Sequence, residues 1–179
     1  MAVSRRHLIL SGLAAPLLAA CDKGAPGAAP TPSLSFKSID ITADDIMVLQ
    51  NAGPNAPECM PEAGYLPIPK KLARAGLKDM VRISDARMSG TAFGTIVLHV
   101  TPDAASGGPL ALVRNGDRIK LSIAKRTIDL LVDEPTLAKR RAEPREVFEK
   151  PTRGYAKLFA EEITGADLGC DFRFLRKAP

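Results

Sequence analysis

The sequence lacks tryptophan altogether, and aromatic residues make up only 4% of its 179 positions. A chain of this length can bury a sizeable core in one domain, so that core must be built from aliphatic side chains. Cysteine occurs three times, at positions 21, 59 and 170, without any CxxC pair. The odd count argues against a disulfide framework, and the spacing is not that of a cysteine metal site.

The chain also lacks the aromatic and basic platforms on which nucleic acids stack, although its net charge is +5 and its pI is near 9.3. Its basic residues gather instead in two short amphipathic segments, around Lys70–Arg74 and at 139–141. Such segments are typical of solvated helix faces. We therefore expect no nucleic-acid partner.

The first twenty-one residues resemble an export leader. Arg5 and Arg6 precede an apolar run over 8–20 that is too short to cross a membrane, and the run ends in Leu-Ala-Ala-Cys21. This pattern is similar to a bacterial lipobox, which predicts lipidation of Cys21, a membrane anchor and a periplasmic location. Ser4-Arg5-Arg6 gives a weaker twin-arginine signal. The alternative is an apolar N-terminus that arose by chance.

Residues 22–40 are rich in glycine, alanine and proline, and they predict a flexible linker. The opening of the chain, through SFKSIDIT, resembles the start of the copper-delivering Sco lipoproteins. The CxxxC copper motif of that family is absent. The resemblance therefore implies a leader and a linker, and no copper chemistry.

The segment 80–100 dominates the rest of the chain. Two apolar runs, at 80–84 and 95–100, are rich in β-branched residues and predict strands. The loop between them carries Asp85, Arg87 and Ser89, a combination that a rigid scaffold often presents for chemistry. By spacing alone the ordinary interpretation is a connecting loop in which Ser89 bonds its own backbone.

This segment, RISDARMSGTAFGTIVLHVTPDAASGGPLALV, resembles the C-terminal domain of the dihydroxy-acid and sugar-acid dehydratases, which include phosphogluconate dehydratase. The flanking VLQNAGPN, MPEAGYLPIPKKLARAGLKDM, GDRIKLSIAKRTIDLLVDE and GYAKLFAEEITGADLGCDFRFL fit the same family in order. DARMSG is closest to its sugar-acid branch. The resemblance covers about 41–175, so we place the dehydratase-type domain at 41–179.

The resemblance implies a reaction and a site. The family removes water from 2,3-dihydroxy acids to give 2-keto acids, using Mg²⁺ and an iron–sulfur cluster. Ser89, in the R-x-S-G motif, corresponds to the proposed base, and Arg87 could hold the substrate carboxylate. Glu62, in the MPE motif, corresponds to a Mg²⁺ ligand, although a solvated loop acid is the ordinary interpretation of such a residue. Cys59 replaces the glycine that usually precedes this motif.

The predicted fold is mainly β with peripheral helices, and the resemblance implies a small swivelling β-barrel of the β/β/α kind. We expect strands at 46–50, 110–113, 118–124 and 127–132, with Asn115-Gly116 turning a hairpin between the second and third of these. Helices are expected at 69–75, 133–142 and 155–163. His99 lies in an apolar strand and is interpreted as structural, and Cys170 as a buried thiol.

The cluster cysteines of the family lie in a large N-terminal domain that this sequence does not match. We therefore expect a truncated hydro-lyase that has little activity without that domain or a homo-oligomer partner. The resemblance implies a small polyhydroxy-acid substrate. It also implies a cytoplasmic location, which conflicts with the export that the leader predicts. The alternative is an exported, lipid-anchored β-barrel with a binding or structural role.

Overall fold

The computed structural model describes residues 3–11, 41–56, 64–145 and 149–176, with only the backbone for the first range. Six strands form one sheet in the order β4-β3-β2-β1-β5-β6. Their bounds are β1 Val3–Ser11, β2 Ile46–Gln50, β3 Arg82–Ser84, β4 Ile96–Val97, β5 Arg118–Ser122 and β6 Thr127–Leu130.

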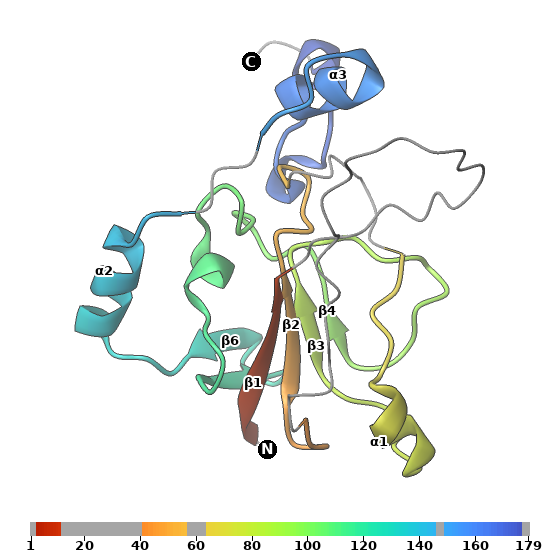
Figure 1. Ribbon diagram of the computed structural model, residues 1–179, viewed down its shortest axis with the longest axis vertical. Helices are drawn as coiled ribbons and strands as arrows, with labels where there is room; N and C mark the ends of the chain where they lie inside the picture. Colours follow the sequence, from red (N-terminus) through yellow and green to blue (C-terminus); the bar gives the residue numbers. More distant parts are fainter. Residues whose placement is uncertain (1–2, 12–40, 57–63, 146–148, 177–179) are drawn as a thin grey trace, which may run out of the picture.

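The four strands from β4 to β1 run parallel. Strand β5 runs antiparallel to β1, and β6 runs antiparallel to β5. The carboxyl ends of the parallel strands therefore meet at one edge of the sheet. Figure 1 shows the C-terminal helix α3 (Gly154–Glu162) beyond that edge, and helix α1 (Lys70–Arg74) near the opposite end. The loops that follow β2 and β3 lie together at the carboxyl edge.

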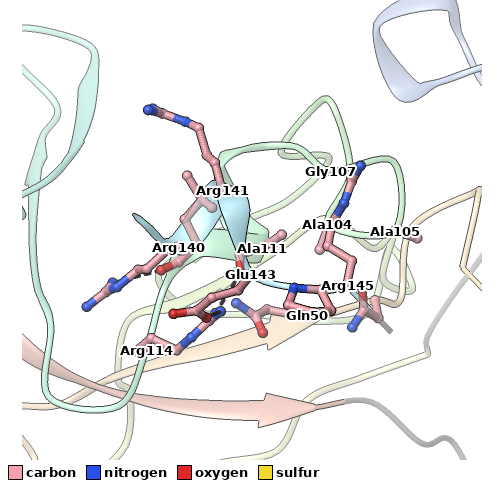
Figure 2. Close-up of a pocket in the computed structure, with 13 residues that line it drawn as sticks. Gln50, Ala104, Ala105, Gly107, Ala111, Arg114, Arg140, Arg141, Glu143 and Arg145 are labelled. Atoms are coloured by element: carbon pink, nitrogen blue, oxygen red, sulfur yellow. Dashed lines mark hydrogen bonds and ion pairs between the residues drawn. The ribbon is translucent and has the colours of Figure 1, made fainter. Parts of the chain in front are cut away.

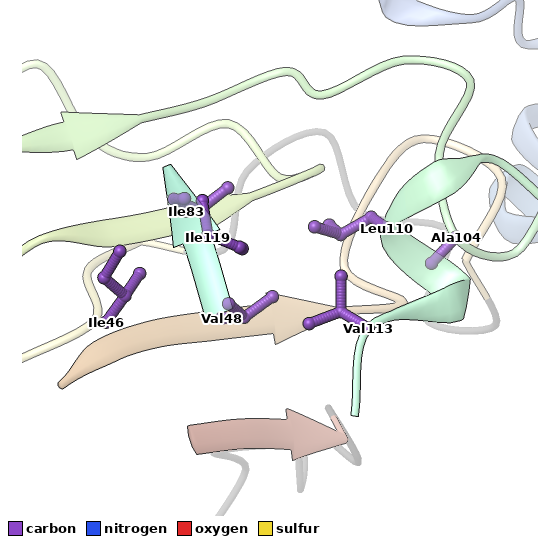
Figure 3. Close-up of a cluster of buried hydrophobic side chains, with 7 residues drawn as sticks. All are labelled: Ile46, Val48, Ile83, Ala104, Leu110, Val113 and Ile119. Carbon is purple, nitrogen blue, oxygen red and sulfur yellow. The ribbon is translucent and has the colours of Figure 1, made fainter. Parts of the chain in front are cut away.

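Strand β2 is buried on both faces, which explains its unbroken apolar run. Ile46 and Val48 belong to the main core cluster with Ile83, whereas Met47 packs on the other face with Ile41. Figure 3 shows the main cluster, whose members are Ile46, Val48, Ile83, Ala104, Leu110, Val113 and Ile119. All of these side chains are aliphatic, as the scarcity of aromatic residues predicts.

A sheet with a few helices around it is partly consistent with the mainly-β domain that the sequence predicts, but the barrel is not found in the described part of the chain. There the strands make an open sheet, with β4 and β6 at its two edges. Closure would require those edges to pair. Strand β4 has only two residues, and its register pairs are with β3 alone.

The predicted strand at 110–113 is wrong. Residues Pro109–Leu112 form a 3-10 helix, η2, that begins with a proline at its first position. The buried amide of Gln50 donates hydrogen bonds to the carbonyls of Leu110 and Val113, 3.2 Å in the second case. These bonds hold the segment in a compact turn. Asn115-Gly116 therefore connects η2 to β5 and does not turn the predicted hairpin between two strands. The hairpin of this region is the one that joins β5 and β6.

Strand β1 falls inside the predicted leader. Its backbone pairs with β2 from His7–Ile46 to Ser11–Gln50, and with β5 from Val3–Leu121 to Arg6–Arg118. Nine residues that were assigned to the leader therefore form a central strand. Processing at Cys21 is a separate question, because Cys21 and the linker lie outside the described residues.

The predicted helices are present with shifted ends. Helix α2 (Glu134–Ala142) begins after Asp133, whose carboxylate accepts a hydrogen bond of 2.9 Å from the Thr136 N–H. Phe159 of α3 is buried against Phe172 and Cys170. The thiol of Cys170 therefore packs in this cluster, but it is half-buried and not fully buried as predicted. No helix in the described ranges is long and apolar enough to span a bilayer.

Candidate active site

The loop after β3 begins with a fully buried carboxylate. Asp85 Oδ2 accepts the N–H groups of Ala104 and Asn51 at 2.8 and 3.2 Å, and Oδ1 accepts the Ala52 N–H at 3.1 Å. One side chain therefore joins the end of β3 to the loop after β2 and to the turn that contains Ala104. This carboxylate sets the arrangement of the carboxyl edge.

Burial raises the pKa of Asp85, and the charge of nearby Asp103 raises it further, while the three backbone N–H groups oppose the shift. Asp103 is buried too, and burial also favours its neutral form. In its case the hydrogen bonds from Ser106 and Asn55 outweigh burial and lower its pKa. Asn55 donates to Asp103 Oδ2 from both its backbone N–H and its side-chain amide, at 3.0 and 2.9 Å.

Arg82 holds the other side of the loop. Its side chain is 0% exposed, and its guanidinium donates to the carbonyls of Leu66 and Phe93 at 3.0 and 2.8 Å. It also donates to Tyr65 Oη at 3.1 Å and to Asp79 at 2.9 Å. Since residues 65–66 and 93 approach from different segments, Arg82 fixes the two sides of the loop relative to each other.

Ser89 lies in this frame, half-buried and close to the segment that follows the MPE motif. Its N–H donates a hydrogen bond of 2.7 Å to the carbonyl of Gly64, which has a φ of 71°. Its Oγ lies 2.9 Å from Thr91 Oγ1 and accepts the Thr91 N–H at 3.3 Å. The local serine turn that the sequence offered as an alternative is therefore formed, and it presents Ser89 outside the core.

Arg87 is exposed, two residues before Ser89. The remaining predicted site residues, Glu62 and Cys21, lie outside the described residues, as does Cys59. The structure thus brings Ser89 against Gly64, two positions beyond Glu62, but it does not describe the carboxylate itself.

The sequence analysis did not assign roles to Arg82, Asp103 or Thr91. Arg82 carried a usable signal, because a cation inside an apolar strand must find several acceptors when the strand is buried. The role of Asp103 had no such signal. Its partners come from a separate loop, and only folding brings them together.

The described residues do not supply a cofactor-binding set. In that part of the chain no three histidine, cysteine, aspartate or glutamate side chains gather around a point that could hold a metal ion. Burial raises the pKa of Cys170, the only cysteine in those ranges, which disfavours the thiolate that binds a metal. An iron–sulfur cluster therefore does not fit these residues, and we derive no step through one.

Comparison with known proteins decides the family. The profile described as "Dihydroxy-acid/6-phosphogluconate dehydratase C-terminal" matches residues 32–170, which is most of the chain. The chain belongs to this family. The resemblance of the sequence motifs to the dehydratases is thereby confirmed. The match begins at residue 32, which lies within the predicted linker at 22–40.

Curated dehydratases are similar over the same region. The chain is 50% identical over 139 residues to the 6-deoxy-6-sulfo-D-gluconate dehydratase of Pseudomonas putida, covering 78% of this chain and 24% of the relative. It is 48% identical over 139 residues to the L-arabinonate dehydratase of Rhizobium leguminosarum bv. trifolii, with the same coverage of 78% and 24%.

A dihydroxy-acid dehydratase from Methanoregula boonei is 40% identical over 136 residues, covering 76% of this chain and 24% of the relative. Identity is therefore higher to the two sugar-acid dehydratases, as the DARMSG motif predicted. The dehydratase domain described here spans about a quarter of the length of each of these relatives.

Proposed function

We propose that this chain is the C-terminal portion of a hydro-lyase that dehydrates 2,3-dihydroxy acids, sugar acids such as pentonates among them, to 2-keto acids. The family match and the printed activities of the relatives support this class of reaction. The higher identity to the sugar-acid enzymes favours a polyhydroxy substrate over a branched-chain dihydroxy acid.

One contact carries the proposal. The 2.7 Å hydrogen bond from Ser89 N–H to the Gly64 carbonyl ties the R-x-S-G loop to the chain just beyond the MPE motif. Arg82 and Asp85 hold this loop from within, so its exposed groups can act on a ligand without the loop losing its shape. This is the arrangement that a site shared between two loops requires.

In this site Ser89 Oγ, as the alkoxide, takes the proton from the substrate carbon that bears the 2-hydroxyl. The 3-hydroxyl then leaves as hydroxide, which takes up the proton from Ser89 to form water, and the resulting enol becomes the 2-keto acid. Arg87 binds the substrate carboxylate through its guanidinium, which stays charged at any working pH. A serine needs neighbouring positive charge to ionise, whereas the groups that bond Ser89 Oγ in the structure are the neutral hydroxyl and N–H of Thr91.

In this proposal the positive charge comes from a metal, from the cluster or from a neighbour such as Arg87. We propose that Glu62 binds Mg²⁺, and that an N-terminal dehydratase domain brings the iron–sulfur cluster; the swivelling barrel belongs to the same proposal. A homo-oligomer could place a second copy at this edge. The chain by itself would then show little dehydratase activity.

The test is formation of 2-keto acid from a pentonate, with iron and Mg²⁺ supplied. We expect no turnover by the chain alone, and turnover when it is joined to the N-terminal part of a related dehydratase. In the joined protein, Ser89→Ala should abolish activity, whereas Thr152→Ala, at an exposed position, should preserve it. Turnover by the chain alone, or full activity of Ser89→Ala, would contradict the proposal.

We also propose that lipidation at Cys21 and the folded sheet exclude each other in one molecule. Cleavage before Cys21 removes β1, the strand that lies between β2 and β5 and pairs with both. A molecule that folds with β1 in place keeps its N-terminus. The mass of the intact protein from the soluble and membrane fractions tests this: an unprocessed N-terminus in the soluble fraction and a lipidated Cys21 only in the membrane are expected.

A further inference from the structure

A second site lies at the same edge of the sheet, beside the end of β2. A pocket of about 420 Å³ is bounded by Gln50 and Asn51, by the turn at 104–107, and by the chain at 140–145. Four arginines line it, against the single carboxylate of Glu143. Figure 2 shows Arg114 and Arg145 on opposite sides of this pocket, and Arg141 directed away from it.

Two of the arginines are committed to other partners. Arg140 forms a two-pronged ion pair with Asp117, at 2.6 and 2.9 Å, and also donates to the Leu112 carbonyl at 2.8 Å. Arg141 pairs with Glu134 on the exposed face of α2. The first pair is largely buried and holds α2 against η2, so it forms a fixed wall of the pocket.

Arg145 differs from these two. Among the described residues it has no hydrogen-bond or ion-pair partner, although its guanidinium lies in the pocket wall. It packs directly over Gly107, where a Cβ atom would overlap Arg145 Nη1. Gly107 also has a φ of 81°, which favours glycine. The glycine therefore allows a cation to approach the backbone closely.

Arg114 is partly committed, because its Nη1 donates to the carbonyls of Ala111 and Val113 at 2.7 and 3.2 Å, while its Nη2 takes part in one weak ion pair. Its Nη2 lies 3.3 Å from Glu143 Oε2, and both side chains are more than 40% exposed. An exposed ion pair of this kind contributes little to stability. An incoming anion could displace Glu143 at little cost, and would then lie between two guanidinium groups.

We propose that this pocket binds a small oxyanion, such as a phosphate, sulfonate or carboxylate group, through Arg145 and Arg114, with Glu143 as an internal competitor. Guanidinium groups match the oxygens of such anions in pairs. This inference does not depend on the proposed dehydratase activity. The oxyanion is either free in solution or the charged end of a sugar acid, and both sources present the same chemistry.

The test is titration of the full chain with inorganic phosphate, followed by amide shifts in NMR spectra at constant ionic strength. Arg145→Gln should weaken phosphate binding at least tenfold, which corresponds to about 1.4 kcal/mol. Glu143→Gln should tighten it several-fold, because the competing carboxylate is removed. Arg74→Gln, on the exposed helix α1, is the matched control and should change nothing.

Arg145→Gln and Arg74→Gln remove the same charge, so a difference between their effects separates a specific site from general attraction of anions to a basic protein. Equal weakening by Arg145→Gln and Arg74→Gln would overturn the proposal, as would shifts confined to residues outside the pocket. D-gluconate serves as the second probe. Competition between gluconate and phosphate identifies the sugar acid as a source of the anion, and its absence identifies free phosphate. Neither result depends on turnover, so the site can fail while the dehydratase proposal stands.

Discussion

The buried guanidinium of Arg82 supports the sharpest prediction about stability. Replacement by methionine keeps much of the volume but removes every donor. The carbonyls of Met80, Leu66 and Phe93 then lose hydrogen bonds of 3.3, 3.0 and 2.8 Å. Each carbonyl left without a partner costs about 1–1.5 kcal/mol. The ion pair with Asp79 adds little, because Asp79 is 38% exposed and can be rehydrated.

These contributions predict a loss of about 3–5 kcal/mol in the free energy of unfolding of Arg82→Met, the range seen when a buried charged network is broken. Urea unfolding followed by circular dichroism measures it, with Arg74→Met as the control on the exposed helix α1. We expect the midpoint to fall with little change in slope. Arg82→Lys should recover part of the loss, since one ammonium group cannot reach all of the acceptors.

The same substitution should loosen the candidate active site. Amide exchange at Ser89, whose N–H bonds the Gly64 carbonyl, should accelerate more than exchange in the core strand β2. A variant that unfolds at the same urea concentration as the natural chain would refute the reasoning. So would a stable variant in which exchange at Ser89 is unchanged.

Three further predictions concern carboxylates. Asp85→Asn should lower the free energy of unfolding by about 1–3 kcal/mol, because one of the N–H groups that the carboxylate accepts must then face an NH₂ group; urea unfolding of the variant checks this. Asp103 has a pKa below its unfolded value, so its contribution is present above about pH 4 and is lost as the pH falls through the folded pKa. Thermal unfolding between pH 2 and 6 should therefore be less acid-sensitive in Asp103→Asn, and an unchanged acid profile would count against the assigned hydrogen bonds. Asp133→Ala removes the N-cap of α2 and should lower the free energy of unfolding more than Asp129→Ala, in the exposed part of β6, does in the same unfolding assay.

Local patterns in the sequence predicted much of the fold. The apolar run of β2, the pair of strands that flanks the turn at 123–126, and the start of α2 at Asp133 all appear in the structure. Each depends on contacts within a few residues or on a period that the residues themselves show. The family was also recognisable, because its motifs are long and occur in the right order.

The parts that were missed depend on distant contacts. The segment 110–113 has the composition of a strand, yet the buried amide of Gln50, sixty positions earlier, holds its carbonyls in a 3-10 turn. The backbone of residues 3–11, inside the predicted leader, lies between β2 and β5, a position that the local composition does not show. At 110–113 the partner in the folded chain overrides the local preference.

The sequence by itself determined the family, the aliphatic core and the position of Ser89 in a loop between two strands. Only the tertiary structure decided that Arg82 and Asp85 hold that loop, that Ser89 bonds Gly64, and that Arg114 and Arg145 face one pocket. The physical reason is that buried charges are tolerable only when several acceptors or donors converge on them. That convergence is a property of the folded chain and of no single segment.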